Sequence, residues 1–94
     1  MEQVEHDAGA ERFVVRLGGS EEAILEYHRS GKVLDFVHTF VPPAFRGRGL
    51  AHMVVRAGLS YARANSLKVI PSCPYVATYI RRHPEDQDLI SNRA

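Results

Sequence analysis

The first third of the chain alternates between apolar and polar residues with the period of a β-strand. Alternate positions are apolar in Glu11–Leu17 and again in Glu22–His28. This pattern predicts two half-buried strands. The turn residues Gly18-Gly19-Ser20 between them favour an antiparallel hairpin. Residues 1–10 fit either a loose end or a short first strand.

The next segment, Val33–Val41, is apolar over nearly its whole length. Such a run is typical of a central strand that is buried on both faces. The turn residues Arg29–Lys32 come directly before it. Pro42-Pro43 is expected to end the strand, because proline has no N–H group to donate to a sheet ladder.

Residues Arg48–Ala64 carry the clearest helical pattern in the chain. One face is apolar and the other is polar, so we expect the helix to pack one side against the sheet and to expose the other. The apolar stripe consists of Leu50, Val54, Ala57, Gly58 and Tyr61, and the polar side of His52, Arg56, Ser60 and Arg63.

The last third predicts another strand over Leu67–Cys73 and a short helix over Tyr75–Arg82. Pro74 suits the first position of that helix, and Pro84 is expected to end it. Glu85–Ala94 is a polar tail, in which Leu89-Ile90 is a candidate docking point and residues 91–94 a loose end. Because a strand, a long helix and a strand form a crossover, the two strands should be parallel. We therefore expect one α/β domain over residues 1–94 with a mixed, mostly antiparallel sheet.

Composition narrows the class of protein. The chain has 94 residues, a formal net charge of +1 and a single cysteine, Cys73. A near-neutral domain is unlike a general nucleic-acid binder, and no apolar run approaches the ~20 residues that span a bilayer. One cysteine builds neither a disulfide nor a zinc site, and the histidines lack ligand spacing. We expect a cytoplasmic protein without a metal.

A glycine-rich loop joins the third predicted strand to the long helix. It reads Arg46-Gly47-Arg48-Gly49-Leu50-Ala51. A helix start leaves N–H groups unpaired at a positive dipole end, and glycine lets a phosphate approach the backbone closely. The loop is therefore a candidate anion site. The alternative is that the two glycines only allow a tight turn.

The loop resembles the acyl-CoA motif of the GCN5-related N-acetyltransferases, [Q/R]-x-x-G-x-[G/A]. The flanking Val41-Pro42, Phe45 and the amphipathic helix also match. The resemblance implies that the amides of Arg46–Ala51 bind the pyrophosphate of coenzyme A, and that Phe40 and Val41 on the preceding strand pair with the pantetheine arm. It also implies the compact fold of that family, with a long helix after the central strand and a short C-terminal helix.

The likeness extends to a small single-domain branch of acetyltransferase-like proteins and covers most of the chain. It is carried by His38-Thr39, Val41-Pro42, the glycine-rich loop, Ile70-Pro71, Cys73-Pro74-Tyr75-Val76, Tyr79-Ile80 and His83-Pro84.

The resemblance names Cys73 and His38 as catalytic candidates. Cys73 would lie near the thiol end of coenzyme A, as an acyl carrier, as lining of the pocket or as a small buried side chain. Phe40 stands where relatives often carry a polar residue, and it cannot accept a proton. That leaves His38 or water as the base, unless His38 only forms a structural hydrogen bond.

The last helix offers further candidates. Tyr75 and Tyr79 are four residues apart and so share a face. The resemblance implies that Tyr79 and His83 contact the cofactor, with Tyr79 also a candidate acid toward the leaving thiolate. The alternatives are core packing and a solvated basic helix end. His52 and Arg56 are expected to face solvent, away from the site.

Two functions follow from this interpretation. The first is an N-acetyltransferase that moves an acetyl group from acetyl-CoA to an amine, with an unidentified small or protein acceptor. The second is a coenzyme A-binding module with little or no catalysis that works with a protein partner. The shortness of the chain supports the second, since it leaves few residues to enclose an acceptor.

Overall fold

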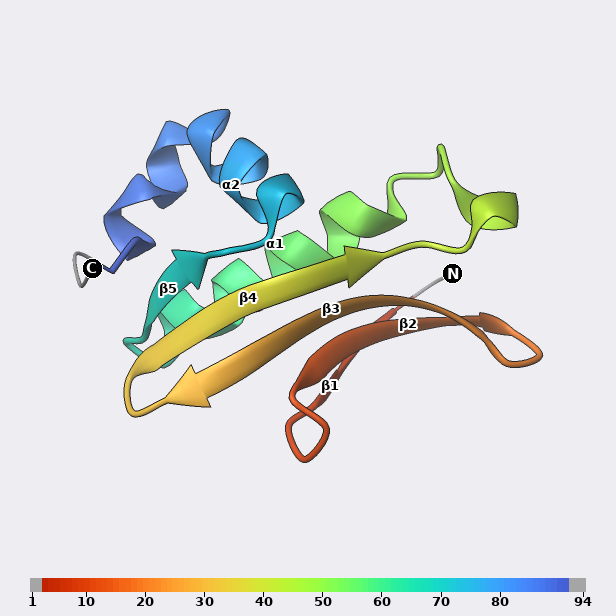
Figure 1. The fold of residues 1–94 in the computed structure, drawn as a ribbon, viewed down its shortest axis with the longest axis horizontal. Coiled ribbons are helices and arrows are strands. Elements are labelled where there is room, and N and C mark those ends of the chain that lie inside the picture. The colour runs from red at the N-terminus through yellow and green to blue at the C-terminus, as the bar shows by residue number, and fades with distance from the viewer. Residues whose placement is uncertain (1–2, 92–94) are drawn as a thin grey trace.

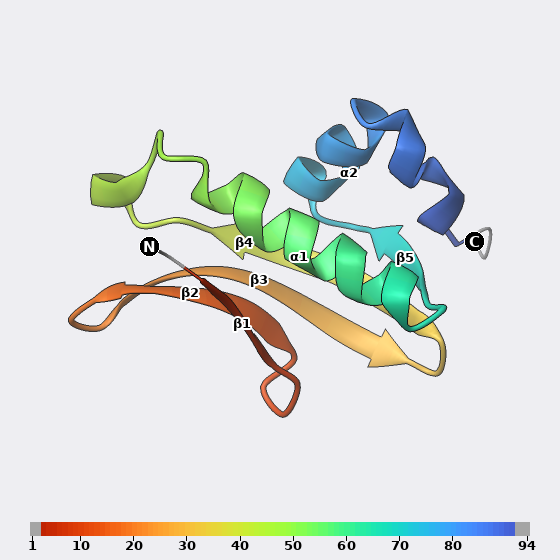
Figure 2. The same cartoon turned by 180° about the vertical axis from the view of Figure 1, so that it is seen from behind.

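A single sheet organises the chain, and a long helix covers one of its faces. The computed structural model describes residues 3–91. Figure 1 shows the uncovered face of the sheet, and Figure 2 shows α1 lying across the opposite face. The elements are β1 (Val4–Asp7), β2 (Arg12–Gly18), β3 (Glu21–Ser30), β4 (Val33–Phe40), the 3₁₀ turn η1 (Pro43–Phe45), α1 (Leu50–Ala64), β5 (Lys68–Pro71), α2 (Pro74–Arg81) and the 3₁₀ helix η2 (Pro84–Leu89).

The sheet has the mixed character that the sequence predicts. Its strand order is β1-β2-β3-β4-β5; the first four strands pair antiparallel, and β5 pairs parallel with β4. The α/β class is thereby confirmed. Residues 4–7 form the short first strand, whose His6 shares a 2.7 Å hydrogen bond with the Tyr27 hydroxyl.

The core lies between the sheet and α1. Alternate residues of the strands point toward the helix, as the period of 2 requires. On α1 the buried stripe is wider than expected, because the sheet, α2 and η2 all contact this helix. Val55, Leu59 and Ala62 are buried, whereas Ala57 and Tyr61 are only half-buried. The strand residues of the core include Phe13, Val15, Ala23, Leu25, Tyr27, Leu34, Phe36 and Val69.

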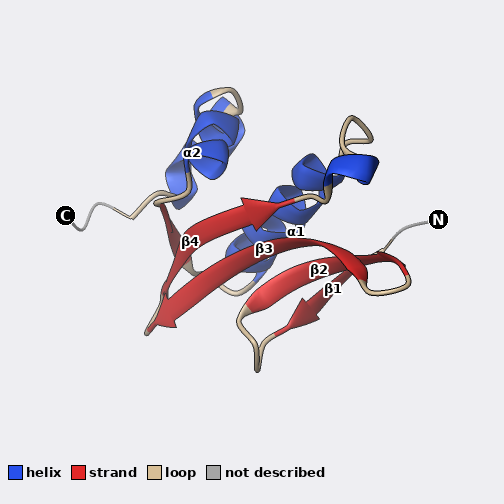
Figure 3. Cartoon of the chain, turned by 45° about the vertical axis from the view of Figure 1, so that its right-hand side comes forward, coloured by secondary structure: helices blue, strands red, loops and turns tan. Residues whose placement is uncertain are grey.

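Burial on β4 differs from the prediction of a strand buried on both faces. Only Leu34 and Phe36 are buried, and His38 and Phe40 are exposed. The reason is that no helix covers the second face of the sheet within the described residues (Figure 3). The strand is nevertheless internal, because it lies between β3 and β5.

Element boundaries shift by one or two residues from the expected ones. The helix α1 begins at Leu50 rather than Arg48, because Gly47 and Gly49 adopt positive φ angles of 85° and 76° that a helix does not allow. The strand β5 ends at Pro71 rather than Cys73, where the chain turns into α2.

The C-terminal segment is more ordered than a polar tail. Pro84–Leu89 forms η2, and Leu89 is buried. Ile90 makes a parallel bridge to Val69, and the Ser91 N–H donates to the Val69 carbonyl at 2.8 Å. The docking point at Leu89-Ile90 is thereby confirmed. The loose ends expected at residues 1–10 and 91–94 fall partly on residues 1–2 and 92–94, which lie outside the described range. No helix among the described residues is long and apolar enough to cross a membrane.

Gly58 generates a prediction about stability, because it is the point of closest approach between α1 and the sheet. A Cβ atom there would lie 2.9 Å from Leu25 Cδ2 and 3.0 Å from two ring atoms of Phe36. Alanine in place of glycine favours a helix by about 1 kcal/mol, but overpacking a tight core costs about 1–3 kcal/mol. We expect Gly58→Ala to lower the free energy of unfolding in urea.

The matched control is Ser60→Ala at an exposed position of the same helix, where the change should be neutral or stabilising. A Gly58→Ala protein as stable as the wild type would mean that Leu25 and Phe36 have room to move.

Candidate functional site

The strands β4 and β5 separate partway along their length. Their pairing runs from Val33 opposite Lys68 to Phe36 opposite Pro71. One further hydrogen bond, from the Cys73 N–H to the Phe36 carbonyl at 2.8 Å, closes the paired region. Beyond it β4 continues, while the segment that follows β5 turns into α2 (Figure 1). The separation leaves the last part of β4 without a neighbour on that side.

A cleft of about 390 Å³ occupies this region. The end of β4, the loop that follows, the first turn of α1 and the start of α2 all contribute to its wall. It is lined by Thr39, Phe40, Val41, Phe45, Arg46, Gly47, Gly49, Leu50, Ala51, His52 and Tyr75.

A β-bulge in β4 decides which side chains face the cleft. Tyr27 is opposite Phe36 and Glu26 is opposite His38, so Val37 is the extra residue. The bulge shifts the alternation by one, because side chains on a strand point to opposite faces in turn. Thr39 therefore shares the α1-facing side with Phe36, whereas His38 and Phe40 point to the uncovered face. The His38 and Phe40 rings are stacked there, with centroids 6.4 Å apart.

The start of α1 forms the floor of the cleft and leaves backbone N–H groups available. The first helical hydrogen bond runs from the Met53 N–H to the Gly49 carbonyl at 3.0 Å. The amides of Leu50, Ala51 and His52 precede it and have no partner within the helix. Gly49 provides no side-chain cap, and no acidic residue lies in the first turn. This end of the helix therefore has the character of an anion site.

The two arginines of the loop differ in their placement. Arg46 lines the cleft, and its Nε donates to the Val41 carbonyl at 2.9 Å while its guanidinium lies 5.9 Å from the centroid of the Phe40 ring. Arg48 instead lies over Phe45, with its guanidinium carbon 5.2 Å from that ring, and does not line the cleft. Only Arg46 can add positive charge to the cleft without moving.

Cys73 lies behind the cleft wall, at the point where the strands separate. Its side chain is 6% exposed, and its Sγ is 3.4 Å from Thr39 Oγ1. Burial raises the pKa of the thiol, but the Thr39 hydroxyl and the N–H groups of Val76 and Tyr75 outweigh burial, so the pKa is below its ordinary value. The two amides approach the sulfur without forming a capping hydrogen bond of good geometry. Thr39 thus connects the thiol with the cleft.

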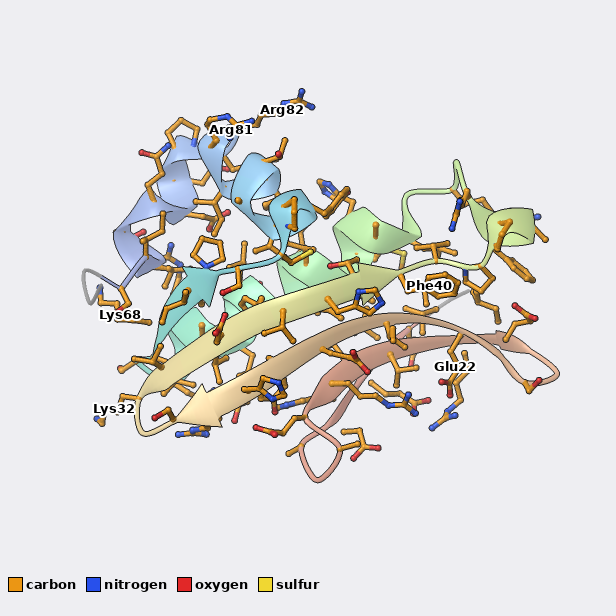
Figure 4. The ribbon with its side chains drawn as sticks, in the orientation of Figure 1. Glu22, Lys32, Phe40, Lys68, Arg81 and Arg82 are labelled. Carbon is orange, nitrogen blue, oxygen red and sulfur yellow. The ribbon has the colours of Figure 1, made fainter. Side chains whose placement is uncertain are left out.

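The aromatic residues of α2 are divided between two places. Tyr75 is 43% exposed and lines the cleft. Tyr79 is buried, and burial raises the pKa of its hydroxyl. Its ring stacks on His83 with centroids 3.9 Å apart, and the His83 Nδ1–H donates to the Tyr79 carbonyl at 2.7 Å. Tyr79 and His83 line a smaller adjoining cavity of about 130 Å³ rather than the cleft. Arg81 at the end of α2 and Arg82 directly after it are exposed (Figure 4), and Arg82 also lines the smaller cavity.

The expectation that His52 faces solvent away from the site was wrong. Its ring is half-buried, lies 5.1 Å from the Tyr79 ring and 5.9 Å from the His83 ring, and borders both the cleft and the smaller cavity. The helical pattern placed it on the polar side, but α2 covers that part of α1. Arg56 is exposed, as expected, although it borders another small cavity.

The structure brings most of the sequence candidates together, with clear exceptions. The residues of the predicted site that line the cleft are Phe40, Val41, Arg46, Gly47, Gly49, Leu50 and Ala51. Cys73 is adjacent to the cleft but buried, and His38, Arg48, Tyr79 and His83 lie outside it. Neither Thr39 nor His52 was among the site residues that the sequence predicts. The β-bulge that turns Thr39 toward the cleft has no signal in the residue pattern.

The described residues contain no group of three or more histidine, cysteine, aspartate or glutamate side chains placed to hold a metal ion.

Comparisons with known proteins agree with this geometry. A family model described as GCN5-related N-acetyl-transferase matches residues 12–89. Protein NATD1 of Gallus gallus is 40% identical over 89 residues, which cover 93% of this chain and 81% of that protein. Protein NATD1 of Homo sapiens is 39% identical, with coverages of 93% and 79%. The NMR structure of a GCN5-like protein from Staphylococcus aureus has a TM-score of 0.74 at 20% identity and covers 98% of this chain and 90% of its own, which shows the fold.

The contact between Thr39 and Cys73 predicts how the thiol titrates. Because the Thr39 hydroxyl lowers the pKa of the thiol, its removal should raise that pKa. We expect the rate of alkylation by iodoacetamide, measured against pH, to have its midpoint at higher pH in Thr39→Val and near the wild-type midpoint in Thr39→Ser. Cys73 is the only cysteine, so the modified mass reports on it alone. A midpoint that is the same in all three proteins would contradict the assignment.

Proposed function

The chain belongs to the GCN5-related N-acetyltransferase family, and from this we propose that it binds acetyl-CoA in the cleft and transfers the acetyl group to an amine. The observation that carries the proposal is the start of α1, where uncapped backbone amides form one end of a cleft beside an unpaired length of β4. The family membership supports this class of reaction, and the cleft is the place that we propose for it.

The loop residues 46–51 fit the pyrophosphate of coenzyme A. An anion at the first turn of α1 would satisfy N–H groups that have no partner in the helix and would interact favourably with the helix dipole. Added Cβ atoms at Gly47 and Gly49 would meet no described atom within 4 Å, so the space beside the backbone is open. Arg46 adds a positive charge at the edge of the cleft.

The last residues of β4 fit the pantetheine arm. This arm contains two amide groups, and an extended backbone without a strand neighbour can hydrogen-bond to them as a sheet would. Phe40 and Val41 both line the cleft at this position. Tyr79 and His83, in the smaller cavity that adjoins the cleft through His52 and Tyr75, would contact the nucleotide end.

The reactive end of acetyl-CoA would then lie near Thr39 and Cys73, where the strands separate. Bound acetyl-CoA supplies an activated thioester, which an unprotonated amine can attack. A cysteine relay would need the thiol to reach the thioester, yet the thiol is 6% exposed and lies behind Thr39. We therefore propose direct attack by the amine.

The uncovered face of the sheet would receive the acceptor. His38 and Phe40 lie on this face beside the end of the cleft. Of the candidates that the sequence predicts, His38 is the one that could act as a base on this side. An amine with a pKa near ~10.4 is almost fully protonated at neutral pH and needs such a base. The bare face also supports the second function, a coenzyme A-binding module, because a protein partner could complete the site there.

Gly49 offers a test of cofactor binding. Valine is strained at a φ of 76° and would add bulk beside the amides. We expect Gly49→Val to weaken coenzyme A binding by about tenfold or more in calorimetry, because the anion site of the helix start is lost. Arg46→Ala should weaken it less, by about 1 kcal/mol or below.

The matched control is Gly31→Val, which places the same residue at a similar positive φ of 60° in the remote β3–β4 turn. It should lose stability to a similar degree but keep its affinity. Unchanged affinity in a folded Gly49→Val protein would exclude this loop as the binding site.

Direct transfer predicts a second result. Release of free coenzyme A from acetyl-CoA should depend on an added amine, and a panel of amines, polyamines and peptides should show broad, slow use because the acceptor face is open. Intact mass spectrometry after incubation with acetyl-CoA alone should show no hydroxylamine-labile acetyl group on Cys73. A labile adduct that an amine then consumes would establish the relay instead. Binding of acetyl-CoA with no release by any amine would favour the binding module.

A further inference from the structure

Thr39 lines the cleft, and its hydroxyl lies 3.4 Å from the Cys73 sulfur. The β-bulge at Val37 gives it this position. Without the bulge, His38 would share the face of Phe36, and Thr39 would point to the uncovered side of the sheet. The irregularity therefore places a hydroxyl group, rather than an imidazole ring, at the reactive end of the cleft.

The surroundings of the sulfur favour one direction for the hydrogen bond of this pair. The backbone amides of Val76, Tyr75 and Thr39 lie near the sulfur and favour negative charge on it. A neutral thiol turns its own proton toward an oxygen rather than toward N–H groups. The side-chain oxygen beside it is Thr39 Oγ1, 3.4 Å from Sγ. A hydroxyl that accepts from the thiol keeps its own proton free for another acceptor.

We infer that Thr39 is a catalytic residue of the proposed transfer, whose hydroxyl donates a hydrogen bond to the thioester carbonyl oxygen of bound acetyl-CoA, and that Cys73 is a positioning residue that orients this hydroxyl. The inference rests on the proposed function. The donor acts where negative charge develops during attack by the amine, and the hydrogen bond that the hydroxyl accepts from the thiol strengthens it. No covalent bond to Cys73 is formed.

The position of Cys73 is consistent with this role. A nucleophile must meet the reacting carbon, but an orienting group needs to touch only the hydroxyl. The buried thiol, its contact with Thr39 and its absence from the cleft lining all fit an orienting group.

Kinetics of four variants test the assignment. Removal of one such donor typically costs about 10²–10³ in kcat, so Thr39→Val should lower kcat by about tenfold or more with little change in the KM for acetyl-CoA, and Thr39→Ser should recover most of it. Cys73→Ser keeps a donor to Thr39 and should recover kcat relative to Cys73→Ala. Ser30→Ala removes a hydroxyl at the exposed end of β3, outside the cleft and the smaller cavity, and is the control.

The pH dependence of the transfer rate distinguishes the thiol from the thiolate form of Cys73. As pH rises through the pKa of Cys73, the thiolate becomes an acceptor and draws the Thr39 proton to itself, so the cleft loses its donor. The rate of the wild type divided by that of Cys73→Ser should therefore fall with rising pH. The other titratable or charged groups around the cleft are His38 and Arg46 from β4 and its loop, His52 from α1 and Tyr75 and Tyr79 from α2. They are the same in both proteins, so their titration cancels in the ratio.

A spectroscopic measurement tests the hydrogen bond without turnover. The infrared carbonyl band of acetyl-CoA labelled with ¹³C at the carbonyl should lie at lower frequency when bound to the wild type or Thr39→Ser than when bound to Thr39→Val, in the absence of an amine.

The outcomes separate the inference from the function on which it rests. A wild type that neither binds nor uses acetyl-CoA overturns the proposed function. A wild type that is active while Thr39→Val has the same kcat and the same carbonyl frequency overturns the inference alone. A rate ratio that rises with pH, together with loss of transfer in Cys73→Ser, would also overturn it and would identify the thiol as the nucleophile.

Discussion

The separation of β4 from β5 is the feature on which the rest of the candidate site depends. The strand β5 pairs with β4 over all four of its residues, but β4 is twice as long and continues beyond the last pair. The chain of β5 turns into α2 at Pro74, where proline cannot extend a ladder. The consequence is a length of β4 backbone without a neighbour and a cleft beside it. A β5 as long as β4 would fill this space and leave no site.

The helix α1 contributes both to the core and to the candidate site. Its buried residues pack on the sheet, and at Gly58 the contact is too close for a side chain. This packing fixes the direction of the helix, so that its uncapped first turn faces the cleft. The hydrophobic core thus positions backbone amides that have no role in the core itself. The proposed anion site would be built from backbone N–H groups, which favours glycine in this loop more than a particular charge.

The two faces of the sheet differ in what covers them. One holds nearly all of the core, because α1 covers it. The other carries His38, Phe40 and the ion pairs that Arg12 and Arg16 form with Glu22, and no helix lies over it in the described residues (Figure 3).

The sequence by itself determined the order of the elements, the mixed sheet and the location of the glycine-rich loop. These features depend on local properties: the periods of strand and helix, the missing N–H of Pro42-Pro43 and the conformational freedom of Gly47 and Gly49. The tertiary structure alone decided which side chains reach the cleft. Because of the bulge in β4, Thr39 rather than His38 faces the cleft. The helix α2 buries part of the polar side of α1 around His52, and Cys73 lies behind the cleft wall. Each of these outcomes depends on contacts between segments far apart in the chain, and no residue pattern within one segment records them.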